Sequence, residues 1–61
     1  MKYWYVLQYN EQGQYCTHYY YALPDSKDIH DYVDKYCKCY PMTKKEYEGT
    51  MQFYRVDVPV E

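Results

Sequence analysis

The sequence has few of the residues that build a deep apolar core or a strongly charged binding surface. Isoleucine, phenylalanine and arginine occur once each, and glycine only twice, among the 61 residues. No apolar run approaches the roughly 20 residues that a membrane-spanning helix needs, and two glycines do not supply a Gly-rich phosphate-binding loop. Lysine and arginine together number 7 against 9 aspartate and glutamate residues, so the net charge of -2 gives no basic footprint for duplex DNA. We therefore expect no membrane span, no duplex DNA partner and no cofactor.

Tyrosine supplies most of the apolar surface instead. Aromatic residues make up 23% of the chain, and they comprise 12 tyrosines, one tryptophan and one phenylalanine. A chain of this length forms one domain, residues 1–61, and buries only about 60% of the surface that its unfolded form exposes. So thin a core leaves the folded state marginally stable unless a partner shares the core. The commonest association of this kind is a homodimer, so we expect this chain to self-associate.

The cysteines and the first residues favour a cytoplasmic protein. The chain has 3 cysteines, an odd number, and Lys2 is followed at once by a tyrosine-rich alternating segment rather than by the apolar stretch of a signal peptide. Thiols of cytoplasmic proteins stay reduced, so we expect no disulfide bond.

Residues 2–9 and 15–23 predict a β-hairpin, because both segments are rich in aromatic and β-branched residues. Asn10 at the first position of the connecting turn can bond the backbone ahead of it, and Gly13 at the fourth can adopt the left-handed conformation. These two residues are typical of a type I turn closed by a bulge.

Residues 26–39 predict an amphipathic helix that begins after Pro24 and ends before Pro41. Its apolar positions recur at helical spacing and form one stripe, at Ile29, Tyr32, Val33, Tyr36, Cys37 and Tyr40. Val33 and Tyr36 lie near the centre of this stripe, so we expect them in the core.

A short helical turn over residues 44–48 and a strand over residues 51–58 complete the predicted fold. Thr43 and Glu46 have the spacing of a capping box, and Gly49 can end the turn. A helical crossover favours a last strand parallel to the second one, with the first strand between them. The predicted fold is therefore α+β, a ββαβ arrangement with sheet order 2-1-3.

The hairpin register sorts the side chains into two faces, and one helix can cover only one of them. Counted from the turn, Asn10 should oppose Gln14 and Tyr5 should oppose Tyr19. We expect the helix on the face with the natural core anchor and small neighbours, namely Trp4, Val6, Cys16 and Ala22. The other face would then expose a wall of tyrosines with one leucine: Tyr3, Tyr5, Leu7, Tyr9, Tyr15, Tyr19 and Tyr21. The reverse packing stays open, because Leu7 and, at the end of the second strand, Leu23 belong to the tyrosine face.

An exposed tyrosine wall predicts a binding surface for another protein, including a second copy of this chain. Tyrosine offers a large contact area and has only two side-chain torsions to order. The alternative is that half-exposed strands favour tyrosine for its β propensity alone. We expect a non-catalytic module that acts by occlusion, as small viral and mobile-element inhibitors of host enzymes do, although this expectation rests on analogy between classes.

Binding of single-stranded nucleic acid is the second functional hypothesis. Exposed tyrosines can stack on bases, each with about 1 to 3 kcal/mol. Cations that would hold the phosphates are scarce on the predicted hairpin, where Lys2 is the only one, and Arg55 is the sole arginine. We therefore rank this hypothesis below protein binding.

Metal binding and catalysis have weaker support. Cys16, His18 and Cys37 could converge between the sheet and the helix, but they lack the spacing of a zinc knuckle. Cysteine with His18 or His30 is the only conceivable nucleophile and base, and neither pair belongs to a catalytic signature. We expect no metal and no enzymatic activity.

Overall fold

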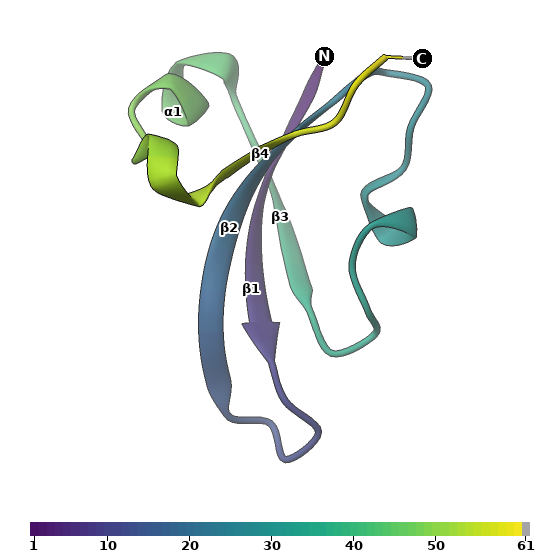
Figure 1. Ribbon diagram of the computed structural model, residues 1–61, viewed down its shortest axis with the longest axis vertical. Helices are drawn as coiled ribbons and strands as arrows, with labels where there is room; N and C mark the ends of the chain where they lie inside the picture. Colours follow the sequence, from purple (N-terminus) through teal and green to yellow (C-terminus); the bar gives the residue numbers. More distant parts are fainter. Residues whose placement is uncertain (61) are drawn as a thin grey trace.

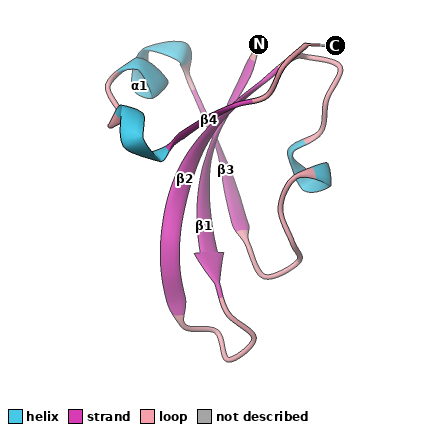
Figure 2. Ribbon diagram, in the orientation of Figure 1, coloured by secondary structure: helices cyan, strands magenta, loops and turns pink. Residues whose placement is uncertain are grey.

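The computed structural model describes residues 1–60 and contains a four-stranded sheet with one short helix (Figure 1, Figure 2). The strands are β1 (Lys2–Tyr9), β2 (Tyr15–Leu23), β3 (Lys38–Met42) and β4 (Arg55–Asp57), in the sheet order β3-β1-β2-β4. The helix α1 (Lys44–Glu48) and two 3-10 turns, η1 (Ile29–Asp31) and η2 (Gln52–Tyr54), lie in the connections. The predicted hairpin and the predicted helical turn over 44–48 are confirmed, whereas the predicted strand count and order are wrong.

The sheet order differs because the segment predicted to end a helix forms a strand. β3 pairs antiparallel with β1 and occupies the position that the prediction gave to the last strand. The last strand, β4, is parallel to β2 as expected, but it lies beside β2 at the other edge and is only three residues long. Pro41 is compatible with β3 because β3 is an edge strand, where a missing N–H leaves no ladder bond unmade.

The turn of the hairpin forms as predicted. Gly13 has φ of 80°, and its N–H donates to the Asn10 carbonyl at 3.0 Å. The Asn10 side-chain oxygen accepts from the backbone N–H groups of Gln12 and Gln14, at 3.0 Å and 2.9 Å. Asn10 and Gln14 also pair through their backbones, so the register at the turn is the predicted one.

A bulge at Cys16 then changes the register by one residue. Tyr9 pairs with Tyr15 and Gln8 with Thr17, which leaves Cys16 as an extra, exposed residue. From there on Tyr5 opposes Tyr20 rather than Tyr19. Because side chains alternate along a strand, the shift exchanges the two faces of β2 beyond the bulge. The predicted placement of Tyr19 and Tyr21 beside Tyr5 is therefore wrong, as is that of Ala22 beside Trp4, and Cys16 lies in the bulge.

The helix predicted over residues 26–39 is absent, and a mostly irregular segment with one 3-10 turn replaces it (Figure 2). Aspartate side chains accept hydrogen bonds from backbone N–H groups that a helix would pair with its own carbonyls. Asp28 accepts from the N–H of His30 at 3.0 Å, and Asp34 accepts from the N–H of Tyr36 at 2.9 Å. Such local bonds compete with helical ones, which is why aspartate favours caps and turns over helix interiors. The bond at Asp28 also lowers the pKa of that carboxyl, with the His30 imidazole adding to the effect.

This segment nevertheless covers the face of the sheet that carries Trp4 and Val6, which we call the covered face. Its anchor is Ile29, which is fully buried with Val6 and Leu23. Partly buried residues surround these three: Trp4, Tyr21, Val33, Cys37, Cys39 and Val58. In Figure 1 the segment lies to the right of the sheet, opposite α1 and η2. Val33 thus contacts the core from its edge, whereas Tyr36 is half-buried outside the core cluster, so the predicted role of Tyr36 is wrong.

Candidate functional site

The other side of the sheet carries a continuous group of aromatic side chains, which we call the aromatic face. Its members come from all three long strands and from η2: Tyr5, Tyr9, Tyr15, His18, Tyr20, Tyr40 and Tyr54. The pairing of β1 with both neighbours sets Tyr40, Tyr5 and Tyr20 in one row across β3, β1 and β2. The Tyr5 and Tyr20 rings are stacked with centroids 5.5 Å apart, and the Tyr5 and Tyr40 centroids are 6.3 Å apart.

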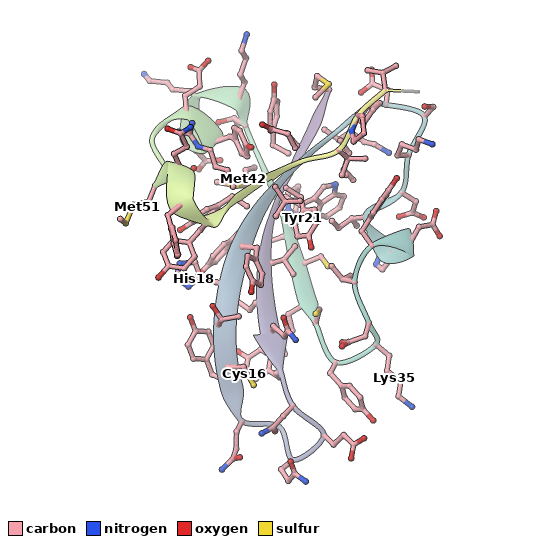
Figure 3. All side chains as sticks on the ribbon, in the orientation of Figure 1. Cys16, His18, Tyr21, Lys35, Met42 and Met51 are labelled. Carbon is pink, nitrogen blue, oxygen red and sulfur yellow. The ribbon has the colours of Figure 1, made fainter. Side chains whose placement is uncertain are left out.

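His18 joins this row to the aromatic residues nearer the hairpin turn. Its ring stacks on Tyr54 at 4.6 Å and meets the edge of Tyr20 at 5.5 Å. The Tyr15 hydroxyl lies 2.7 Å from Nδ1 of His18, within hydrogen-bonding distance. Loss of hydration and the neighbouring phenols, Tyr5 first among them, raise the pKa of Tyr15. Figure 3 shows His18 on the left of the sheet, the side of α1 and η2, with Lys35 of the covering segment on the opposite side.

The end of the aromatic side nearest the termini is covered by α1 (Figure 1). There the Tyr47 ring of α1 packs on Tyr3 with centroids 4.8 Å apart, and its hydroxyl donates to Asp57 Oδ1 at 2.9 Å. Burial, followed by the hydrogen bond to Asp57, raises the pKa of Tyr47 to about 12. α1 has only 5 residues, and in the row of Tyr5, Tyr20 and Tyr40 the first two side chains are partly exposed and Tyr40 is 47% exposed.

The only arginine serves the fold rather than the aromatic face. Nη2 of Arg55 donates to the carbonyls of Glu48 and Thr50, at 2.8 Å and 2.9 Å, and Nε donates to Thr50 Oγ1 at 3.0 Å. The guanidinium therefore satisfies carbonyls that the end of α1 leaves open, and it ties the segment after α1 to β4. Lys38, whose Nζ lies 5.2 Å from the Tyr9 ring centroid, remains as a cation at the aromatic face.

Two exposed apolar residues outside the predicted tyrosine wall extend the aromatic face. Phe53 is 85% exposed and meets the Tyr54 ring at right angles, with centroids 5.2 Å apart. Met51 is 67% exposed and lies on the same side of the sheet (Figure 3). Phe53 is the only phenylalanine of the chain and lies within the predicted strand 51–58, but the strand forms only from Arg55 onward, which leaves Phe53 exposed.

A shallow pocket lies between α1 and the row formed by Tyr5, Tyr20 and Tyr40, which we call the tyrosine row. Its volume is about 300 Å³, and its lining consists of Tyr5, Tyr20, Tyr40, Pro41, Met42, Glu46 and Thr50. Glu46 is the only charged residue in that lining. The capping box of α1 fixes its position, because Glu46 Oε1 accepts from the N–H of Thr43 at 2.9 Å and the Thr43 hydroxyl accepts from the N–H of Glu46 at 3.1 Å.

The structure divides the residues of the predicted tyrosine wall. Tyr5, Leu7, Tyr9 and Tyr15 lie on the aromatic side, and Tyr3 lies there beneath Tyr47. Tyr19 and Tyr21 lie on the covered face because of the Cys16 bulge, and Tyr21 packs against the core. The aromatic face instead contains four residues outside the predicted wall: His18, Tyr20, Tyr40 and Tyr54.

The weak metal candidates are not brought together. Cys16 lies in the exposed bulge and His18 on the aromatic face, whereas Cys37 contacts the core on the covered face. Within residues 1–60, no group of three or more histidine, cysteine or acidic residues could hold a metal ion. Burial is the main cause that raises the pKa of the Cys37 and Cys39 thiols, and the Cys37 thiol donates to Asp34 Oδ1 at 3.4 Å.

Comparison of the chain with protein-family models, with curated proteins and with solved structures finds no match. None of the helices formed by residues 1–60 has the length and apolar character that crossing a membrane requires.

Proposed function

We propose that this chain is a non-catalytic protein-interaction module that binds another protein, or a second copy of itself, through the aromatic face. One observation carries the proposal: aromatic side chains from three strands and η2 form a contiguous surface on one side of the sheet, and among them Tyr15 and Tyr40 are exposed to solvent. Tyr40 is 47% exposed and Phe53 85% exposed, so large apolar groups at both margins of this surface meet solvent.

The physical argument is that soluble monomers rarely expose a contiguous apolar patch without a use for it. Tyrosine and phenylalanine side chains bury a large area for few ordered torsions, and binding energy concentrates in such anchors. The tyrosine hydroxyls keep this surface compatible with water in the unbound chain. Occlusion of the partner's own site is the mode of action that such a surface supports, and it requires no catalytic group.

Site-specific photo-crosslinking tests the proposal. Phe53 is replaced by p-benzoylphenylalanine, and the chain is irradiated in the cells that produce it. We expect one discrete adduct, either a dimer of this chain or a complex with one other protein. A Tyr40→Ser change in the same chain should lower the yield of that adduct at least about tenfold, since it removes a ring from the same surface.

The control places p-benzoylphenylalanine at Tyr32, which is also exposed but follows η1 on the opposite side of the sheet. Equal adducts from positions 32 and 53, or none from position 53, would contradict the proposal. Single-stranded nucleic acid is tested separately by titration of a mixed-sequence oligonucleotide at low salt. Saturable quenching of tyrosine fluorescence that salt reverses would replace protein binding with nucleic-acid binding.

A further inference from the structure

The pocket beside the tyrosine row combines aromatic walls with one negative charge. Three of its seven lining residues are Tyr5, Tyr20 and Tyr40, and Pro41 and Met42 add further apolar surface. The three tyrosines belong to one row of the sheet, so the strand pairing fixes the spacing of their backbones. At about 300 Å³ the pocket is at the lower limit for small-molecule sites and matches a single side chain better than a larger ligand.

The charge in this pocket is anchored. Glu46 occupies the third position of α1, and its Oε1 accepts from the N–H of Thr43 at 2.9 Å. Among residues 1–60, the hydrogen bonds and ion pairs of the structure leave Glu46 Oε2 without a partner. The arginine that could neutralise this carboxylate is bound to the carbonyls of Glu48 and Thr50 instead.

We propose that this pocket receives a lysine or arginine side chain of the partner protein, with the cation held against the rings of Tyr5, Tyr20 and Tyr40 and facing the Glu46 carboxylate. The faces of aromatic rings carry negative electrostatic potential and attract ammonium and guanidinium groups. The aliphatic stem of either side chain can lie along Pro41 and Met42 while its charge reaches Glu46. This inference rests on the proposed function, because it names the chemistry of the partner at the aromatic face.

Titration of the purified chain with small cations tests the pocket without knowledge of the partner. The probes are tetramethylammonium chloride, N-acetyl-lysine amide and N-acetyl-arginine amide, and the readout is the NMR shift of the backbone amides of Tyr5, Tyr20 and Tyr40. Neopentyl alcohol, which resembles tetramethylammonium in shape but is uncharged, is the control ligand. We expect saturable shifts with all three cations. Neopentyl alcohol should bind at least about twofold more weakly than tetramethylammonium.

Two substitutions on the same helix separate the role of the pocket charge from that of the net charge. Glu46→Gln keeps a side-chain acceptor for the capping box but removes the negative charge, and we expect it to weaken cation binding about two- to fivefold. Glu48→Gln removes the same charge from an exposed residue outside the pocket lining and should leave the affinity unchanged. Equal binding of neopentyl alcohol, no effect of Glu46→Gln, or equal effects of the two substitutions would each overturn the inference.

The outcomes also separate this inference from the proposed function. If crosslinking from position 53 persists while the cations fail to bind, the interaction surface stands and the cation pocket does not. If the cations bind and no crosslinked partner forms, the pocket stands and the proposed function does not.

Discussion

Truncation of Ile29 tests whether the irregular segment between β2 and β3 is a true part of the core. Ile29 is 0% exposed and is the one residue of this segment in the fully buried cluster with Val6 and Leu23. Removal of buried methyl and methylene groups from isoleucine costs about 2 to 5 kcal/mol. The total free energy of unfolding of a chain this size is about 3 to 9 kcal/mol. Ile29→Ala should therefore remove much of the stability and lower the melting temperature by at least about 10 °C.

The assay is urea or thermal unfolding followed by the fluorescence of Trp4, which packs against the same cluster. Val60→Ala, at a residue that is 73% exposed, is the control and should change the free energy of unfolding by no more than about 0.5 kcal/mol. Val33→Ala should fall between them, because Val33 is only partly buried. Equal unfolding midpoints for Ile29→Ala and Val60→Ala would refute the packing of this segment on the sheet.

Three further predictions concern the bulge, Tyr47 and the thiols. The native chain should show proton–proton contacts between Tyr5 and Tyr20, because Cys16 is an extra residue on β2, and deletion of Cys16 should preserve both the fold and these contacts; contacts from Tyr5 to Tyr19 in the native chain would show the other register. The raised pKa of Tyr47 means that the folded state retains its proton, so its contribution to stability is complete below pH 10 and is lost as the pH rises toward about 12. Tyr47→Phe should make this loss smaller in alkaline unfolding titrations, and an unchanged profile would contradict the assignment. In the native chain iodoacetamide should alkylate the exposed Cys16 well before Cys37 and Cys39, whose burial raises their pKa, and equal rates measured by mass spectrometry would disagree with the structure.

Local signals in the sequence predicted the elements whose geometry is set by a few neighbouring residues. The turn at Asn10 and Gly13 formed as expected because its hydrogen bonds lie within five residues. The capping box at Thr43 and Glu46 formed for the same reason. In both cases side chain and backbone satisfy one another without help from the rest of the fold.

The helical periodicity of residues 26–39 predicted a helix that does not form, because its apolar residues also suit a strand. Cys37 and Cys39 are two apart, which suits one face of a strand, and both contact the core cluster. Pairing of β3 with the open edge of β1 gives this segment a partner for its backbone, which an isolated short helix would lack. Four aspartates between residues 25 and 34 further favour turns over helix.

The composition of the aromatic face depends on one residue that periodicity does not reveal. Without the bulge, the pairing at the turn would extend along β2, and Tyr19 and Tyr21 would lie beside Tyr5. With Cys16 bulged out, Tyr20 lies beside Tyr5 instead, and His18 comes into contact with Tyr54. Tyr21 moves to the core, where it packs with Trp4 and Ile29 in the same cluster. Since both faces of β2 are rich in tyrosine, the hydrophobic pattern does not penalise either register strongly, and the turn alone does not determine the choice. The bulge therefore decides which aromatic side chains are available to a partner, and the contacts of Tyr5 with Tyr20 or with Tyr19 in the native chain test whether it forms.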